Sequence, residues 1–168
     1  MKRILLTLLC LLPLAGCNII TYSFSGTSIQ PDVRTVTLPT FEYKALKVNP
    51  TLSNNLSEAI RTRFRQMTRL EQVEMDGDLE ISGEITGYDV RAQAITANEV
   101  AAQNRLTVTV KVNFTNRKYP EDNFENKSFS AYADYDSTNS LDAVEMTLCD
   151  EIIEKLVEDI FNATVAQW

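Results

Sequence analysis

The middle of the chain alternates apolar and polar residues with a period of two over ten consecutive positions. The apolar positions of this run are Leu106, Val108, Val110, Val112 and Phe114. Because successive side chains of a strand point to opposite faces, such a strand buries one face only. Residues 79–86 and 129–135 show the same alternation. The pattern predicts a largely antiparallel sheet with one packed face and one open face.

Two segments of helical period accompany these strands. In the first, which begins near residues 50–53, the apolar stripe is Leu52, Leu56, Ile60, Phe64 and Met67. The second is predicted over residues 141–166, and its inward stripe is Leu141, Val144, Leu148, Ile152, Leu156 and Ile160. Ser140 is its expected N-cap, and Asp142 and Glu145 are expected in its first turn, where acidic side chains favour the helix dipole.

A first strand over residues 33–43 completes the set of elements. Pro39 indicates an edge position or a bulge in that strand, because proline has no N–H to donate to a ladder. The order of elements is β-α-β-β-β-α. It predicts an α+β two-layer sandwich, with two helices packed on one face of a four-stranded antiparallel or mixed sheet.

The first seventeen residues have the parts of a bacterial lipoprotein export signal. Lys2 and Arg3 are basic, residues 4–12 are apolar but too few to span a bilayer, and Leu14-Ala15-Gly16-Cys17 resembles a lipobox. That resemblance implies cleavage before Cys17, a diacylglycerol thioether on its sulfur, and an acyl chain such as palmitate on its new amino group. Two or three acyl chains anchor a protein durably. We therefore expect the domain to be tethered to a membrane.

Composition divides the chain into three parts. Residues 1–16 are the predicted signal peptide, 17–32 are the lipidated cysteine and a flexible tether rich in turn residues, and 33–168 form a single α+β domain. Loss of Lys2 and Arg3 with the signal takes the formal net charge from −7 to −9. A chain this acidic disfavours nucleic acid as a partner.

The chain has no histidine, and Cys149 is the one thiol expected to survive processing. Cys10 leaves with the signal and Cys17 is alkylated, so no internal disulfide is expected. Cys149 falls among the apolar positions of the second helix, where a small core residue is commoner than a reactive thiol. The missing histidine removes the usual general base and the commonest metal ligand. We expect no enzyme activity, no cofactor and no metal site.

Three stretches resemble the LptE-like lipopolysaccharide-assembly lipoproteins, in a divergent branch of that family. They are Tyr22 to Gly26, Ala101 to Val110, and Leu156 to Asn162 together with Trp168. The resemblance covers nearly the whole mature chain, but it consists of sheet and helix patterns without a chemical signature. It implies a plug and assembly partner for a large outer-membrane β-barrel of the LptD type, with lipopolysaccharide as a second candidate partner.

The residues after the lipobox indicate in which membrane the lipoprotein is anchored. Asn18 stands where an aspartate would favour inner-membrane retention in enteric sorting, and no acidic run of the kind that directs surface export follows Cys17. The resemblance therefore implies a lipid-anchored protein on the periplasmic side of the outer membrane.

The sheet face that the helices leave uncovered is the expected contact with the barrel. Its partner-facing candidates are Tyr88, Thr107, Thr109, Lys111, Asn113 and Tyr132. A polar face suits the hydrated lumen of a transmembrane barrel. Any half-exposed antiparallel sheet carries such polar residues, so most of them do not by themselves indicate a binding face. The two tyrosines are stronger candidates, because aromatic side chains are enriched at interface hot spots.

Two cationic sets are candidates for contact with lipopolysaccharide phosphates, since a guanidinium fork pairs bidentately with phosphate. The first set is spaced by four residues along the first helix: Arg61, Arg65 and Arg69. A solvated helix face paired with carboxylates such as Glu58 is the simpler explanation of that set. The second set lies at strand ends and loops, where ligand contacts often gather: Arg91, Arg105, Arg117 and Lys118.

Three other functions fit parts of the pattern. A pilot or adaptor lipoprotein for another outer-membrane secretion pore would share the anchor, the size and the polar sheet. An envelope hydrolase would use a carboxylate pair, Glu121 with Asp122 or Asp134 with Asp136, but both pairs lie in turn-rich segments and have no histidine partner. A soluble-ligand binding module would need a hollow core, which the pattern does not predict.

Overall fold

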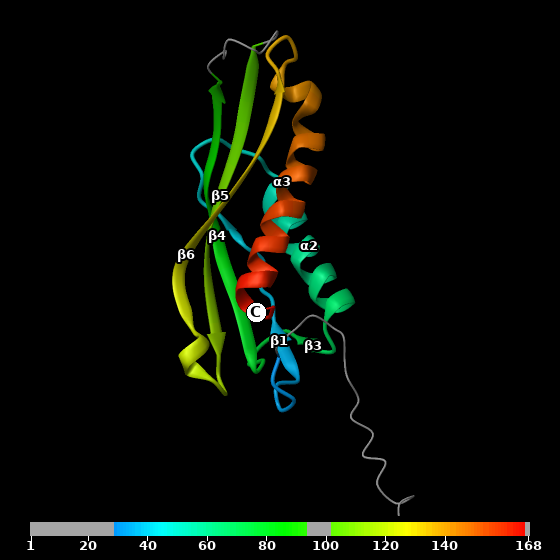
Figure 1. Cartoon of the computed structure of the whole chain (residues 1–168), viewed down its shortest axis with the longest axis vertical. Coiled ribbons are helices and arrows are strands. Elements are labelled where there is room, and N and C mark those ends of the chain that lie inside the picture. The colour runs from blue at the N-terminus through cyan, green and yellow to red at the C-terminus, as the bar shows by residue number, and fades with distance from the viewer. Residues whose placement is uncertain (1–28, 94–101, 167–168) are drawn as a thin grey trace, which may run out of the picture.

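Two helices pack on one face of a mixed sheet in the computed structural model, which describes residues 29–93 and 102–166 (Figure 1). The strands are β1 (Thr35–Thr37), β2 (Glu42–Tyr43), β3 (Glu71–Val73), β4 (Leu79–Ala92), β5 (Gln103–Asn116) and β6 (Phe124–Asp136). The helices are α2 (Leu52–Met67) and α3 (Leu141–Thr164), with a short 3-10 helix η2 (Pro120–Asp122) between β5 and β6. The predicted α+β two-layer sandwich is confirmed, with six strands in the described sheet rather than four.

The sheet joins three long antiparallel strands to short parallel ones. Its order is β3-β1-β4-β5-β6, and β2 pairs with β4 farther along the edge that β1 occupies. The predicted strand over residues 33–43 is broken around Pro39 into β1 and β2, because proline cannot donate to the ladder. The strand β3 was not predicted, since three residues are too few to show a period.

Both helices bury the stripes that their periodicity predicts. The buried residues of the α2 stripe are Leu52, Leu56, Ile60 and Phe64, whereas Met67 at its end is 39% exposed. Those of the α3 stripe are Leu148, Ile152, Leu156 and Ile160, with Leu141 and Val144 partly buried. The helices meet where the rings of Phe64 and Phe161 pack edge to face, 5.1 Å between centroids. Cys149 is buried in this core, as predicted.

The start of α2 is capped by a residue outside the helix. The side-chain Oδ1 of Asn49 accepts hydrogen bonds from the N–H groups of Thr51 (3.2 Å) and Leu52 (3.1 Å). Such N–H groups have no acceptor inside a helix, so this contact helps to set where α2 begins. The helix α3 begins after Ser140, as predicted, with Asp142 in its first turn.

Phe41 joins the β1–β2 connection to both layers. Its N–H donates to Ser57 Oγ (2.9 Å) on α2, and its carbonyl oxygen accepts a hydrogen bond from Ser53. Its ring lies against Gly83 of β4, where an added Cβ would be 2.5 Å from Phe41 Cε1 and 2.5 Å from the Lys111 carbonyl oxygen. A glycine at position 83 therefore allows the ring to lie directly on the sheet.

Candidate partner-binding face

Both helices lie on the same side of β4, β5 and β6, so within residues 29–93 and 102–166 no helix covers the opposite face of these strands (Figure 1). We call it the open face. On β5 its side chains are Arg105, Thr107, Thr109, Lys111 and Asn113, and on β6 they are Ser128, Ser130, Tyr132 and Asp134. Each β5 residue from Arg105 to Lys111 in this set stands directly across from one on β6, which makes regular rows across the sheet.

The middle rows of the open face are linked by hydroxyl and amide groups. Thr109 Oγ1 lies 3.2 Å from Ser130 Oγ, and Thr86 Oγ1 donates to the Thr109 carbonyl oxygen at 3.4 Å. The Asn113 side-chain oxygen accepts the Asn126 N–H at 2.7 Å, where β6 bulges and Asn126 has a φ of 51°. These contacts leave a flat polar surface with few long side chains.

One end of the open face carries an ordered aromatic side chain. Tyr132 is 47% exposed, and the Arg105 guanidinium lies 3.6 Å from the centroid of its ring. That guanidinium is held by two hydrogen bonds to Asp134, at 2.7 and 2.8 Å. The same bonds lower the pKa of the Asp134 carboxyl and raise the pKa of Arg105. Cation–π contact and a bidentate ion pair thus hold Tyr132 in place at low entropic cost.

The other end of this face is charged. Lys111 is exposed and stands across from Glu84 of β4 and Ser128 of β6. Glu84 is instead paired with Lys44, at 2.6 Å, and that hydrogen bond lowers the pKa of its carboxyl. Among the described residues Lys111 has no carboxylate within ion-pair distance, so its charge is available to a partner.

Tyr88 does not lie on the open face, and this prediction was wrong. It is 4% exposed, and its phenol donates a hydrogen bond to Glu145 of α3. The cause is a β-bulge between Ile85 and Gly87, which moves every later side chain of β4 to the opposite face. The sequence contains a pattern that indicates this bulge. Its apolar positions have odd numbers through Ile85 and even numbers at Tyr88 and Val90, and Gly87 lies between them.

Tyr88 belongs to a buried polar cluster that was not predicted. Asn49 Nδ2 donates to Glu145 Oε1 (3.2 Å) and lies 3.7 Å from Cys149 Sγ. Burial, aided by the hydrogen bond to Glu145, raises the pKa of the Tyr88 phenol, and burial also raises the pKa of the Cys149 thiol. We expected Glu145 in the first turn of α3, but it lies beyond that turn. It is four residues after Leu141 and three before Leu148, so Glu145 faces the same side of the helix as the apolar stripe.

The first cationic set does not form one surface. Arg61 is bound to the chain itself, since its Nε donates to the Leu38 carbonyl oxygen (3.1 Å) and its Nη2 to Thr40 Oγ1 (3.0 Å). Arg69 lies beyond the end of α2, so it does not continue the helical face of Arg61 and Arg65. Only Arg65 of the three is an exposed residue of the helix.

The second cationic set divides between the two ends of the sandwich. Arg91 stands across from Arg105 at one end of the sheet. Arg117 and Lys118 follow β5 at the other end, about 40 Å away at 3.3 Å per residue. Arg117 pairs there with Asp76 (2.8 Å) and Lys118 with Asp78 (3.3 Å). No single phosphate could contact both pairs.

Of the two carboxylate pairs considered for a hydrolase, Asp134 with Asp136 is bound to the chain itself. Asp134 is held by Arg105, and Asp136 accepts hydrogen bonds from Thr138 Oγ1 (2.7 Å) and N–H (2.8 Å). Over residues 29–93 and 102–166, no group of three Asp, Glu, Cys or His residues is placed to hold a metal ion. In the same ranges no helix combines the length and the apolar character needed to cross a membrane.

Several predictions concern residues outside those that the structure describes. They are the signal peptide 1–16, the lipid attachment site Cys17, residues 18–28 of the tether, Ala101 and Trp168.

The fold defines the class of the protein as a two-layer α+β domain, with a packed core under the helices and a polar sheet face on the other side. The model of the family described as LptE, lipopolysaccharide-assembly, matches residues 33–164. The chain belongs to the LptE family, and the resemblance stated from its sequence is confirmed. It is a lipopolysaccharide-assembly lipoprotein in kind; the family is non-enzymatic, associated with the outer membrane and with the lipopolysaccharide transport machinery.

Solved structures of similar fold come from several bacteria. A hypothetical protein from Chlamydia trachomatis is 10% identical with a TM-score of 0.50, over 77% of this chain and 96% of that chain. A minor lipoprotein from Acinetobacter baumannii is 14% identical with a TM-score of 0.46, over 76% of this chain and 89% of that chain. The first likeness concerns the fold alone. No curated protein matches the chain.

Proposed function

We propose that this chain is an outer-membrane lipoprotein, anchored through Cys17 on the periplasmic side, that serves as plug and assembly partner of an LptD-type β-barrel. It binds and supports its partner and catalyses no reaction. Membership of the LptE family supports a role in the lipopolysaccharide transport machinery. The polar side chains of the open face support contact with the barrel through that face.

The observation that carries this proposal is the composition of the open face. Thr107, Thr109, Ser128 and Ser130 present short hydroxyl side chains, with Tyr132 at one end and Lys111 at the other. The lumen of a transmembrane barrel is polar and hydrated, so a surface that exchanges hydrogen bonds is suited to it. Tyr132 supplies an aromatic anchor whose position is already set by Arg105.

Lipopolysaccharide is the second candidate partner in this role. Of the seven predicted cationic residues, Arg65, Arg69 and Arg91 make no ion pair among the described residues and could bind phosphate without first breaking one. They do not form one cluster, so direct lipopolysaccharide contact has less support than barrel contact.

The test of the open face is recovery of the barrel with the tagged chain from mildly solubilised membranes. The double variant Lys111→Glu with Tyr132→Ala should lower the recovery of an LptD-type barrel, because it reverses the free charge and removes the anchor. The control is Arg34→Glu with Met75→Ala, which also reverses one exposed positive charge and truncates one exposed large side chain, but away from the open face and from the candidate cationic residues. Unchanged recovery with the first variant, or an equal loss with the control, would contradict the assignment. Recovery of a different secretion pore would favour the pilot lipoprotein instead.

The test of the anchor is the variant Cys17→Ser. Without the sulfur no diacylglycerol can be attached, so the precursor should keep residues 1–16 and take up no labelled fatty acid. Intact mass and metabolic lipid labelling measure this directly. Normal processing and labelling of the variant would refute the proposed anchor.

A further inference from the structure

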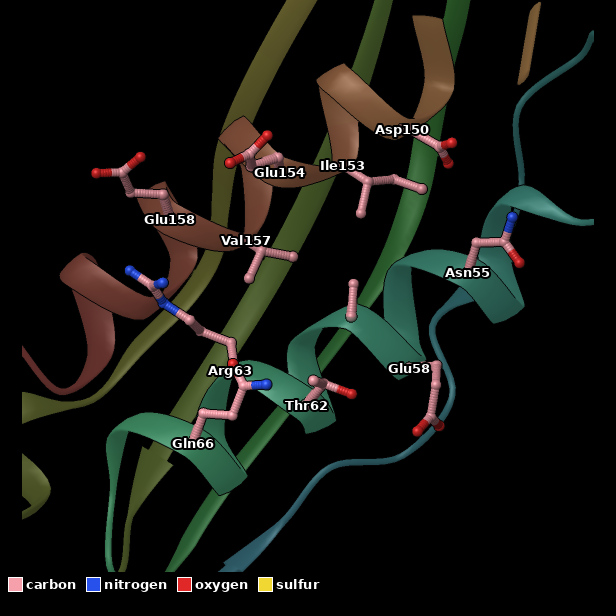
Figure 2. A pocket seen from close by; sticks show the side chains of 11 residues that line it. Asn55, Glu58, Thr62, Arg63, Gln66, Asp150, Ile153, Glu154, Val157 and Glu158 are labelled. Carbon is pink, nitrogen blue, oxygen red and sulfur yellow. The ribbon is translucent and has the colours of Figure 1, made fainter. Parts of the chain in front are cut away.

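A groove runs between α2 and α3 on the outer side of the helix layer, with a volume of about 560 Å³ (Figure 2). Ile153 and Val157 of α3 point toward α2 and, with Ala59 of α2, form its apolar floor. Arg63 reaches from α2 toward α3 in Figure 2, and its guanidinium lies 5.4 Å from the ring centroid of Phe161. The groove lies opposite the open face, and the inference does not depend on what the open face binds.

The groove has a strongly acidic rim. Four carboxylates line it, namely Glu58, Asp150, Glu154 and Glu158, against the single guanidinium of Arg63. Glu58 pairs with Arg61, but Asp150, Glu154 and Glu158 have no ion pair among the described residues. The buried Nε of Arg63 has no hydrogen-bond partner there either. An excess of exposed negative charge around an apolar floor favours a cationic occupant.

The groove continues into an apolar pocket at the start of α2. That pocket has a volume of about 400 Å³ and shares Asn55 and Asp150 with the groove. Val48 and Met146 line it, and 78% of each is exposed, while Leu46 in the same loop is fully exposed. Large apolar side chains gathered at one exposed place mark an interaction site more often than scattered ones do.

We propose that this groove and pocket bind a cationic amphipathic helical segment of another protein. The α2 wall from Asn55 to Gln66 is about 17 Å long at 1.5 Å per residue, which accepts about three turns of helix. Apolar residues of the segment would fill the pocket of Val48 and Met146, and its Lys or Arg side chains would pair with Glu154 and Glu158. This is the helix-in-groove mode of recognition.

The charge of the rim disfavours the other occupants. A second copy of this chain would bring the same carboxylates face to face, since a two-fold interface joins identical patches. An anionic lipid headgroup would be repelled by the same groups. A cationic protein segment is the one occupant that satisfies both the rim and the pocket.

The experiment measures binding of a fluorescent synthetic peptide to the full chain in detergent micelles by anisotropy. The peptide is a helix of about four turns with leucine on one face and lysine on the other. Glu154→Lys with Glu158→Lys should weaken its binding about tenfold or more, because the variant reverses the rim. The matched control, Glu121→Lys with Glu125→Lys, makes the same charge change near η2 and should leave the affinity within about twofold.

A second pair of variants tests the pocket. Val48→Ser with Met146→Ser should also weaken binding about tenfold, whereas Met75→Ser, at a side chain 77% exposed elsewhere, should not. All these side chains are exposed, so circular dichroism should show an unchanged fold. Three results would overturn the proposal: equal weakening by the control variants, equal binding of a peptide whose lysines are replaced by glutamates, or a dimer of the chain in sedimentation that Glu154→Lys dissociates.

Discussion

The two faces of β4, β5 and β6 differ in what their side chains contact, although the same strands make both. On the helix side, Val108 and Val110 are fully buried beneath the helices. On the open side, Thr109 accepts a hydrogen bond from Thr86 of β4 at its carbonyl oxygen, and its hydroxyl lies 3.2 Å from the Ser130 hydroxyl of β6. The helix side therefore contains the core on which folding depends, and the side chains of the open side are available for contact with a partner.

We expect the largest difference in stability between the two faces when a side chain on each is truncated to alanine. Leu156→Ala removes a fully buried side chain from α3 and should lower the free energy of unfolding by about 2–5 kcal/mol. Thr109→Ala on the open face should change it by no more than about 0.5 kcal/mol. Urea unfolding of both variants measures the contrast, and similar losses would mean that the open face is part of the folding core.

A smaller effect is expected from adding one methyl group to each face. Gly83→Ala places a Cβ against Phe41 and the Lys111 carbonyl oxygen, and should cost about 1–3 kcal/mol of stability. At Gly87, beyond the bulge, an added Cβ would lie 3.1 Å from Thr109 Cβ, a contact that a shift of a few tenths of an ångström between the strands relieves. Gly87→Ala should therefore be the milder variant in thermal unfolding, and a reversed order would contradict the assigned faces.

The smallest effect concerns a single carboxyl on the open face. Arg105→Ala removes the two hydrogen bonds to Asp134, so the pKa of Asp134 should rise toward its usual value of about 3.9. The native pKa is lowered, so the stabilisation by this pair is present above the unfolded-state pKa and is lost as the pH falls through the folded-state pKa. NMR titration of the Asp134 carboxyl measures the shift.

The control for that titration is Arg91→Ala. Arg91 stands across from Arg105 and makes no ion pair among the described residues, so its loss should leave the Asp134 pKa lowered. An unchanged pKa in Arg105→Ala, or an equal rise in Arg91→Ala, would show that Arg105 is not the cause.

Much of the fold followed from local periodicity. Alternation over residues 106–115 and the stripes of both helices depend on neighbours a few residues apart, and each was confirmed. Short elements were missed, since β3 has three residues and its pairing with β1 joins positions far apart in the chain. Of the six proposed contacts on the open face, Tyr88 was misplaced because one extra residue in a strand reverses every side chain after it.

The sequence by itself determined the long strands, both helices with their apolar stripes, and the family to which the chain belongs, because these depend on local order and composition. Only the tertiary structure decided how distant segments meet. It placed Tyr88 against Glu145, bound Arg61 to Leu38, separated Arg105 from Arg117, and aligned α2 with α3 to form an acidic groove. Such contacts depend on register and on the packing of whole layers, and no local pattern encodes these.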